Sequence, residues 1–403
     1  MSFQQGLSGL NAAAKNLDVI GNNVANSGTV GFKQSQAQFA DVYANSLTGT
    51  GGSQIGIGVQ LATVAQQFTQ GNITATNNPL DIAINGGGFF RMESNGGITY
   101  QRNGQFQLDR DGFIVGPGGA NLTGYTANAS GVLSTGAPAP LFISTTSLPP
   151  RQSTEVLAQL TLDSTKSTLP AAGFNQNDPT TFHNSTSVSI FDSLGNSHTL
   201  QTYYVKTAAG SWEVFGSLNG AAAGPSVGTL SFNSDGALTT AMPLSTSVTV
   251  STGATSPFSI DLDFSGTTQY GAPFSVDRLV QDGYTSGRLA GFSIADDGTI
   301  LGRYTNGESN VLGQVILASF ANPNGLKPIG NNMWAETAQS GPPLVGTPSS
   351  GNLGVLQSSA VEDSNVDLTA ELVNMITAQR VYQANAQTIK AQDAVMQTLV
   401  NLR

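Results

Sequence analysis

Few side chains in this sequence combine the types and spacing that chemistry requires. Its two histidines, His183 and His198, have no second ligand at helical or zinc-finger spacing, so a satisfied or exposed histidine is expected rather than a metal site. Asp261 and Asp263 have the spacing of one strand face and can bind calcium weakly, although solvent-facing carboxylates are the more common outcome. Without cysteine, disulfides, thiolate metal sites and cysteine nucleophiles are excluded. We therefore assign no metal site.

Gly-rich and catalytic patterns are equally sparse. The glycines at 86–88, followed by Phe89 and Phe90, suggest a phosphate cradle, but no Lys-Ser/Thr pair follows and no strand-loop-helix pattern surrounds them. A tight turn or a close approach of two backbones is the better interpretation. No Ser-His-Asp set or carboxylate pair can be nominated from spacing. We expect no enzymatic activity and no cofactor.

The composition favours a protein that packs against copies of itself. Charged residues make up 10% of the 403 residues, against roughly 25% in a typical domain, so Ser, Thr, Asn, Gln and Gly must cover most of the surface. Few charges then need desolvation at each contact. The net charge of −10, without any basic cluster, argues against nucleic acid as a partner. No apolar run is long enough for membrane insertion.

Two apolar stripes, each alternating steps of four and three residues, predict helices near the two ends of the chain. The first runs through about residue 22, and the second, free of Gly and Pro from 368 to 402, spans about 35 residues. Neither stripe is embedded among strands, so we expect them to bury themselves on each other or on neighbouring molecules, which favours assembly over packing on a core of their own. The assembly residues are Phe3, Leu7, Leu10, Leu17, Leu372, Met375, Tyr382, Ile389, Met396 and Val400.

Between the helices the sequence indicates an almost entirely β structure. Ser, Thr, Gly and Val alternate there, and Asn-Gly or Asp-Gly pairs recur as turn signals. The expected elements are a hairpin at 106–108 and 113–115, a meander at 289–294, 299–304 and 311–320, and a second β block at 187–191, 199–205 and 212–215.

These elements imply nested domains. If the terminal helices lie together, the chain must travel outward and return, so the Pro-rich stretch before 149 and the Gly-rich loop near 284 bound an insertion. The expected fold is α+β and mostly β, with coiled-coil-like terminal helices as an inner layer and β domains projecting outward. The predicted domains are 1–30 plus 362–403 as terminal helices, 31–70 as a connecting segment, 71–148 plus 285–361 as an inner β domain, and 149–284 as an inserted outer β domain.

The most informative motif follows the first helix, and it carries a resemblance to a known family. It consists of Asn22, Asn23, Asn26, Thr29, Gly31, Phe32 and Lys33. Together with segments 85–90, 100–104 and 364–390, it resembles the axial proteins of the bacterial flagellum, the rod and hook proteins. Rod members lack so large an insertion, so the resemblance is closest to the hook members.

This resemblance implies a structural subunit that polymerises into a short curved tube, the flexible joint that passes torque from the rotary motor and rod to the filament. The terminal helices would surround an export channel, with the β domains stacked outward. The implied partners are other copies of the chain, the rod, the hook cap, the hook-filament junction proteins and the flagellar type III export apparatus. The implied location is the hook outside the cell, reached without a cleaved signal peptide, since the N-terminus lacks a basic start and an apolar core.

Alternatives remain open for one motif and for the function. Phe39 and Tyr43, two aromatics four residues apart, resemble the hydrophobic pattern of the family's export signal, while packing between helix and β core explains them equally well. A distal rod protein of the same family and a secreted β-rich adhesin or surface-layer protein are the alternative functions. The insertion argues against the first, and apolar stripes at both ends argue against the second.

Overall fold

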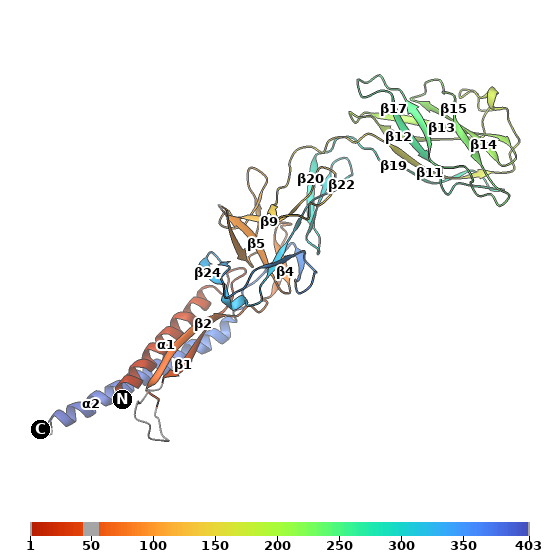
Figure 1. Ribbon diagram of the computed structural model, residues 1–403. Coiled ribbons are helices and arrows are strands. Elements are labelled where there is room, and N and C mark those ends of the chain that lie inside the picture. The colour runs from red at the N-terminus through yellow and green to blue at the C-terminus, as the bar shows by residue number, and fades with distance from the viewer. Residues whose placement is uncertain (1, 43–55, 95, 402–403) are drawn as a thin grey trace. The chain divides into compact units, whose positions relative to one another are not determined.

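The computed structural model describes residues 2–42, 56–94 and 96–401, and the chain divides into two compact units (Figure 1). Unit 1 comprises Met1–Ser144, Phe292–Gly302 and Asn310–Arg403, and unit 2 comprises Thr145–Gly291 and Arg303–Ser309. The chain therefore leaves unit 1, builds unit 2 and returns. The insertion expected at 149–284 lies within Thr145–Gly291 of unit 2. The predicted division into domains stays a prediction.

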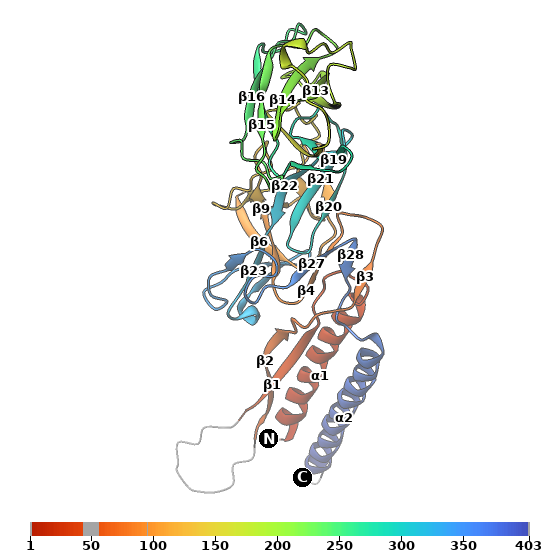
Figure 2. The same ribbon diagram turned by 90° about the vertical axis from the view of Figure 1, so that its right-hand side faces the viewer.

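Unit 1 carries a helix near each end, α1 (Ser2–Ala25) and α2 (Leu368–Asn401). Figure 2 shows the two side by side. They run antiparallel and very close, because a Cβ on Gly6 would lie 3.1 Å from Ile389 Cγ1 and one on Gly9 would lie 2.7 Å from Asn385 Oδ1. Both predicted helices are confirmed, with α1 ending at Ala25 rather than near residue 22. None of the described helices is long and apolar enough to cross a membrane.

The segment 31–70, expected only as a connection, contains an antiparallel hairpin of β1 (Ser35–Val42) and β2 (Gly58–Gln66). The hairpin lies along α1, where the amide of Gln5 donates to the Gly56 carbonyl at 2.6 Å and the Val59 N–H donates to Ser8 Oγ at 3.3 Å. The first helix thus has α2 and this hairpin as neighbours within the same unit.

Most residues of the main β sheet belong to unit 1, and its path runs β20-β21-β22-β9-β5-β6-β25-β24. Tyr100, Phe89 and Trp334 lie in its principal aromatic cluster. The strands of the path are β5 (Phe89–Ser94), β6 (Gly97–Gln101), β9 (Asn121–Thr126), β20 (Leu289–Ile294), β21 (Thr299–Tyr304), β22 (Ser309–Val315), β24 (Lys327–Gly330) and β25 (Met333–Ala335).

Shorter strands complete the core. The ladders β3 (Ile73–Ala75) with β28 (Ala360–Glu362) and β4 (Ile82–Asn85) with β27 (Val355–Ser358) bring the two ends of the β region together. The hairpin expected around Asp111-Gly112 is confirmed as β7 with β8. The remaining elements are β7 (Gln107–Leu108), β8 (Ile114–Val115), β10 (Ala139–Pro140), β23 (Leu317–Ser319), β26 (Leu344–Gly346) and a 3-10 turn, Pro323–Gly325.

The meander is confirmed for β20, β21 and β22, but its third expected strand at 311–320 is wrong in extent. The segment breaks at Ile316, and β23 pairs instead with β5 and β26. Val315, Ile316, Leu317 and Ala318 are all fully buried, so this stretch cannot alternate between a core face and a solvent face as one meander strand would.

Unit 2 is a sandwich of two sheets, with the second β block confirmed in β12, β13 and β14. One sheet has β16 (Leu244–Val248), β17 (Phe258–Asp263), β11 (Glu155–Asp163), β18 (Thr268–Tyr270) and β19 (Ser275–Gln281); the other has β12 (Asn184–Phe191), β13 (Ser197–Ala208), β14 (Ser211–Leu218) and β15 (Ser226–Ser231). A short 3-10 turn, Ala171–Gly173, precedes β12. Leu160 and Ile260 of the first sheet join Tyr204 and Trp212 of the second in one apolar cluster. Both sheets therefore bury one face against the other.

The same turn recurs in both units. At Asp109, Asn128, Asp192 and Asn233, the side-chain Oδ1 accepts hydrogen bonds from the backbone N–H groups two and four residues later. A glycine three residues after each of them has φ between +75° and +90°. The short polar side chain and the glycine together specify a tight hairpin turn from local sequence alone.

Candidate functional site

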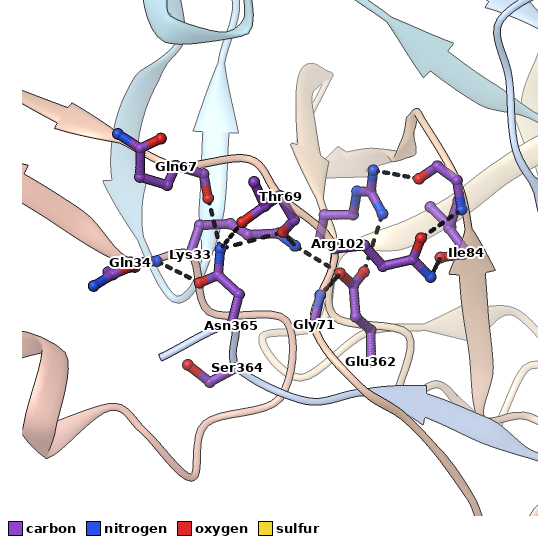
Figure 3. A network of polar contacts seen from close by, with 12 residues as sticks. Lys33, Gln34, Gln67, Thr69, Gly71, Ile84, Arg102, Glu362, Ser364 and Asn365 are labelled. Carbon is purple, nitrogen blue, oxygen red and sulfur yellow. Dashed lines mark hydrogen bonds and ion pairs between the residues drawn. The ribbon is translucent and has the colours of Figure 1, made fainter. Parts of the chain in front are cut away.

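The motif that follows α1 meets the segment that precedes α2 in a buried polar network, drawn in Figure 3. Lys33 Nζ lies 2.6 Å from Glu362 Oε1, and Arg102 Nη1 lies 3.0 Å from Glu362 Oε2. The side chains of Lys33 and Glu362 are fully buried. Lys33 follows α1, Glu362 ends β28 and Arg102 follows β6, so one carboxylate joins three distant segments.

Backbone groups complete the network that we call the junction: Lys33, Arg102 and Glu362 with their backbone partners. Lys33 Nζ also donates to the Thr69 carbonyl at 2.8 Å, and Arg102 Nη2 donates to the Gly86 carbonyl at 2.8 Å. The Gly71 N–H donates to Glu362 Oε1 at 2.9 Å. Because these groups are buried, loss of one partner would leave others unsatisfied, which makes the junction a rigid connection rather than a hinge.

The junction holds two cations against one carboxylate. Burial lowers the pKa of Lys33, an effect that Glu362 opposes and the nearby Arg102 charge reinforces. Burial likewise lowers the pKa of Arg102, against the favourable pull of Glu362, but a guanidinium stays charged at any ordinary pH. Arg102 also lies over the Phe89 ring, with Cζ 5.5 Å from its centroid. Glu362 is thus the one carboxylate that compensates both cations.

Gly31 has two structural reasons to be glycine. Its φ is +70°, and a Cβ there would lie 2.5 Å from Asn103 N. Its N–H donates to the Glu362 carbonyl at 2.8 Å. Gly31 and Lys33 thus both bond to Glu362, and Phe32 between them is buried.

The asparagines of the motif direct the chain out of α1. Asn23 is buried, and its side chain bonds both backbone groups of Ser35, donating to the carbonyl at 2.8 Å and accepting from the N–H at 2.9 Å. Asn26 donates to the Asn22 carbonyl at 2.9 Å, and Thr29 donates to Asn26 Oδ1 at 3.3 Å. These contacts end the helix and start the hairpin at a defined position.

Residues of the segment 364–390, which carries part of the family resemblance, complete the link to α2. Asn365 Oδ1 accepts from the Gln34 N–H at 2.7 Å, and its amide donates to the Gln67 carbonyl at 2.8 Å. Asp367 caps α2 by accepting from the Thr369 N–H at 2.8 Å. Glu371 is buried, and its Oε1 accepts from Gln34 Nε2 at 2.6 Å.

The assembly residues predicted from the stripes differ in their exposure. Ile389 of α2 lies against Gly6 of α1, and Asn385 lies against Gly9. Leu10, Leu17 and Met375 are half-buried. The exposed members are Phe3, Leu7, Leu372, Tyr382, Met396 and Val400. Their role in assembly stays a prediction, and within the described part of the chain much of their apolar surface is exposed.

The proposed export motif is described only in part. Phe39 lies in β1 beside a register shift of the hairpin and is 38% exposed. Tyr43 lies outside the described residues, so the choice between export and packing stays open.

The side chains considered for chemistry have structural partners. His198 is buried with Nε2 3.1 Å from Asp192 Oδ2, and its Nδ1 accepts from the Asn219 amide at 2.9 Å, which assigns the ring proton to Nε2. His183 Nε2 lies 2.8 Å from the Ser167 carbonyl. The described residues contain no group of three His, Cys, Asp or Glu side chains that could hold a metal ion.

The remaining candidates also make ordinary contacts. Asp261 accepts from Ser245 Oγ at 2.6 Å, and Asp263 accepts from the Ser265 N–H at 2.8 Å. A Cβ on Gly86 would lie 2.9 Å from Gly354 Cα, so the glycine triplet marks a close backbone approach, as expected.

Family models match four stretches along the chain. They are those of the flagella basal body rod protein at 3–33, the flagellar hook protein FlgE/F/G D1 domain at 83–162, the flagellar basal body protein FlaE D2 domain at 161–284, and the flagellar basal body rod FlgEFG protein C-terminal region at 357–402. The first and last of these contain the two helices and the residues Lys33 and Glu362 of the junction.

Similar proteins cover the whole length. The flagellar hook protein FlgE of Salmonella typhimurium is 44% identical over 411 residues and that of Escherichia coli 42% over 409, each with 100% of both chains covered. The flagellar hook protein FlgE of Brucella suis is 32% identical, covering 100% of this chain and 98% of its own. The crystal structure of Helicobacter pylori flagellar hook protein FlgE2 shares the fold, with a TM-score of 0.54 at 14% identity, over 72% of this chain and 99% of that one.

Proposed function

This chain belongs to the family of flagellar hook proteins, and from that premise we infer that its copies polymerise into the curved tube that joins the rotary motor and rod to the filament. It is a structural protein of the flagellum. The family and the mostly β fold with terminal helices, both expected from the sequence, are confirmed. The alternatives of a rod protein and of a secreted adhesin are less well supported, since full-length relatives are hook proteins.

The observation that carries the assembly proposal is the combination of uncovered apolar helices with a rigid junction. Leu7 is 44% exposed, Leu372 44% and Met396 61%, although each belongs to an apolar stripe. Exposed apolar surface arranged in stripes marks a protein contact. The junction then transmits a force on these helices to the β core, because Lys33, Glu362 and Arg102 join both helix ends to it. A subunit that carries torque needs such a stiff connection.

In this proposal the helices form the inner layer around an export channel, and the β domains lie further out. The surface outside the helices is rich in Ser, Thr, Asn and Gly, with charged residues only 10% of the chain. Contacts between such surfaces are wet and weak, so neighbouring subunits can slide as the tube bends. Residues 149–284 would then shape the tube while the helices and inner β domain build it.

The other partners are proposed from the family alone. Copies of the chain, the rod, the hook cap and the hook-filament junction proteins would be its neighbours, and the flagellar type III export apparatus would deliver it outside the cell without cleavage. Phe39 is the described part of the export motif. Its exposure supports recognition by a partner as well as packing against a neighbouring copy.

The test is polymerisation of the purified chain followed by negative-stain electron microscopy. Leu7→Asp with Leu372→Asp should abolish tubes, because each places a carboxylate on an apolar contact stripe. Asn11→Asp with Gln383→Asp is the matched control, since both residues are exposed polar positions on the same helices. Tubes formed by the Leu variant, or no tubes from the unaltered chain under any seeding condition, would overturn the proposal.

A further inference from the structure

A pocket of about 680 Å³ opens between α1, α2 and the β1–β2 hairpin, and several small side chains form part of its wall. Ala12, Ala13 and Asn16 of α1, Ala37 of β1 and Ala378 of α2 are among its walls. Larger residues at these positions would have filled the space from within. Because small walls leave room for side chains of another helix, the pocket has the form of a socket.

One unsatisfied carboxylate oxygen stands at this socket. Glu371 is 3% exposed and is the only charged residue among the described residues that line the pocket. Its Oε1 accepts from Gln34, but its buried Oε2 has no hydrogen-bond partner among the described residues. A buried carboxylate oxygen without a donor costs free energy, so a donor brought by another molecule would stabilise the site.

The opposite side of α2 carries a donor of that kind. Glu371 and Arg380 are separated by nine residues, so at about 100° per residue they point to opposite sides of the helix. Arg380 is exposed and has no ion-pair partner in the described part of the chain. It shares one stripe with Val373 and Ile376, which are 58% and 52% exposed. We call Val373, Ile376 and Arg380 the ridge.

Lys390, the other exposed cation of α2, has no comparable apolar residues beside it. Four and seven residues before it stand Ala386 and Gln383, so no large apolar side chain accompanies it on its stripe. A guanidinium also offers several donors in one plane, which suits a pocket whose lining includes the carboxylate of Glu371 and the amides of Asn16 and Asn374. The ridge therefore fits the socket better in both shape and charge.

We propose that the ridge of one copy docks in the socket of a second copy, with Arg380 donating to the free Oε2 of Glu371. This deepens the proposed function and rests on it, since it names the partner of the helix surfaces. Ridge and socket lie on opposite sides of α2, so no copy can satisfy its own socket. Each copy instead offers one ridge and one socket, a head-to-tail contact that extends into a chain of copies rather than closing as a pair.

Charge exchange in the full-length chain tests the pairing. Arg380→Glu should raise the concentration needed for polymerisation by about tenfold or more, because it places a second carboxylate against Glu371. Glu371→Arg should do the same. An equimolar mixture of the two variants should polymerise again, since each ridge then meets a socket of opposite charge. Lys390→Glu, with the same charge change on the same helix, should polymerise like the unaltered chain.

Disulfide cross-linking tests the same pairing independently and requires no charge reversal. The chain has no cysteine, so a chain carrying Asn16→Cys and Ile376→Cys can form only designed disulfides. Mild oxidation of its polymers should give a ladder of dimers, trimers and longer chains on a non-reducing gel, while each single variant stays monomeric on the gel. Circular dichroism of each variant before assembly separates loss of contact from loss of fold.

The outcomes separate this inference from the proposed function. The docking is refuted if the double-cysteine chain forms polymers that give no ladder on the gel. It is also refuted if the Arg380→Glu variant polymerises normally. Neither result contradicts the proposed hook function. Failure of the unaltered chain to polymerise would overturn the function itself.

Discussion

The terminal helices of unit 1 and the sandwich of unit 2 bury their apolar residues in opposite ways. In unit 2, Trp212 and Tyr204 are completely buried within one cluster drawn from two sheets. In α2, Met396 is 61% exposed and Val400 71% exposed. The sandwich therefore obtains its stability within one chain, whereas in our proposal the helices keep their apolar surface for contacts between chains. Under that proposal, stability and assembly are separate tasks of separate regions.

The most severe test of this comparison removes the centre of the sandwich. Trp212→Ala should destabilise unit 2 by about 3 to 5 kcal/mol, because it leaves a large cavity and deprives Gln269 of the indole donor, now 3.0 Å from its Oε1. Urea unfolding followed by tyrosine fluorescence and circular dichroism measures the loss. Helix content should persist through the first transition. A single transition for the whole chain would contradict independent stabilisation of the two regions.

The next largest loss of stability is expected from a substitution in the junction. Glu362→Gln should cost unit 1 about 3 kcal/mol, since Lys33 and Arg102 would remain buried without a compensating charge. Thermal unfolding measures this loss. Gln357→Glu, a change of the opposite charge sign at an exposed position of β27, is a control expected to stay near the unaltered value. If the Glu362→Gln variant is as stable as the unaltered chain, the ion pairs of the junction contribute nothing to the stability of unit 1.

A smaller, pH-dependent effect is expected in unit 2 at Asp192. Burial alone would raise the pKa of this carboxyl, but hydrogen bonds from Thr252, Asn196 and His198 outweigh burial and hold the pKa below its usual range. A depressed carboxyl pKa adds stability that is fully present above about pH 4 and is lost as the pH falls below it. Asp192→Asn should therefore cost about 1 to 2 kcal/mol near neutral pH and less in acid.

Chemical unfolding of both proteins between pH 7 and pH 2 measures this difference. The two stability curves should converge as the pH falls. Parallel curves would show that the Asp192 carboxylate has the same pKa in the folded and unfolded chains.

The smallest effect on stability is expected for a substitution in α2. There, monomer stability should barely change while polymer formation is reduced. Met396→Gln should change the unfolding free energy of the monomer by less than about 0.5 kcal/mol, because this side chain is mostly exposed. The same change should reduce polymer yield in a pelleting assay. A loss of monomer stability without any loss of polymer would reverse the division drawn between the two regions.

Local rules explain what could be predicted of this fold. The turns at Asp109 and Asp192 follow from an acidic side chain and a glycine three residues apart, and α2 follows from its freedom from Gly and Pro. The hairpin of β1 and β2 escaped prediction, because β1 reads Ser-Gln-Ala-Gln-Phe-Ala-Asp-Val and its Gln and Ala residues have weak strand propensity. Its position is instead imposed by contacts such as that of Asn23 with Ser35.

The sequence by itself determined the two helices, the mostly β middle and the family, since periodicity, turn residues and motifs act over a few neighbours. Only the tertiary structure decided that Lys33 pairs with Glu362, 329 residues away, and that Arg102 joins them. It also decided that Gly6 and Gly9 of α1 lie against Ile389 and Asn385 of α2. The physical reason is that the burial of a charge or of a helix face depends on contacts with residues far away in the sequence. The spacing of neighbouring residues carries no information about such contacts.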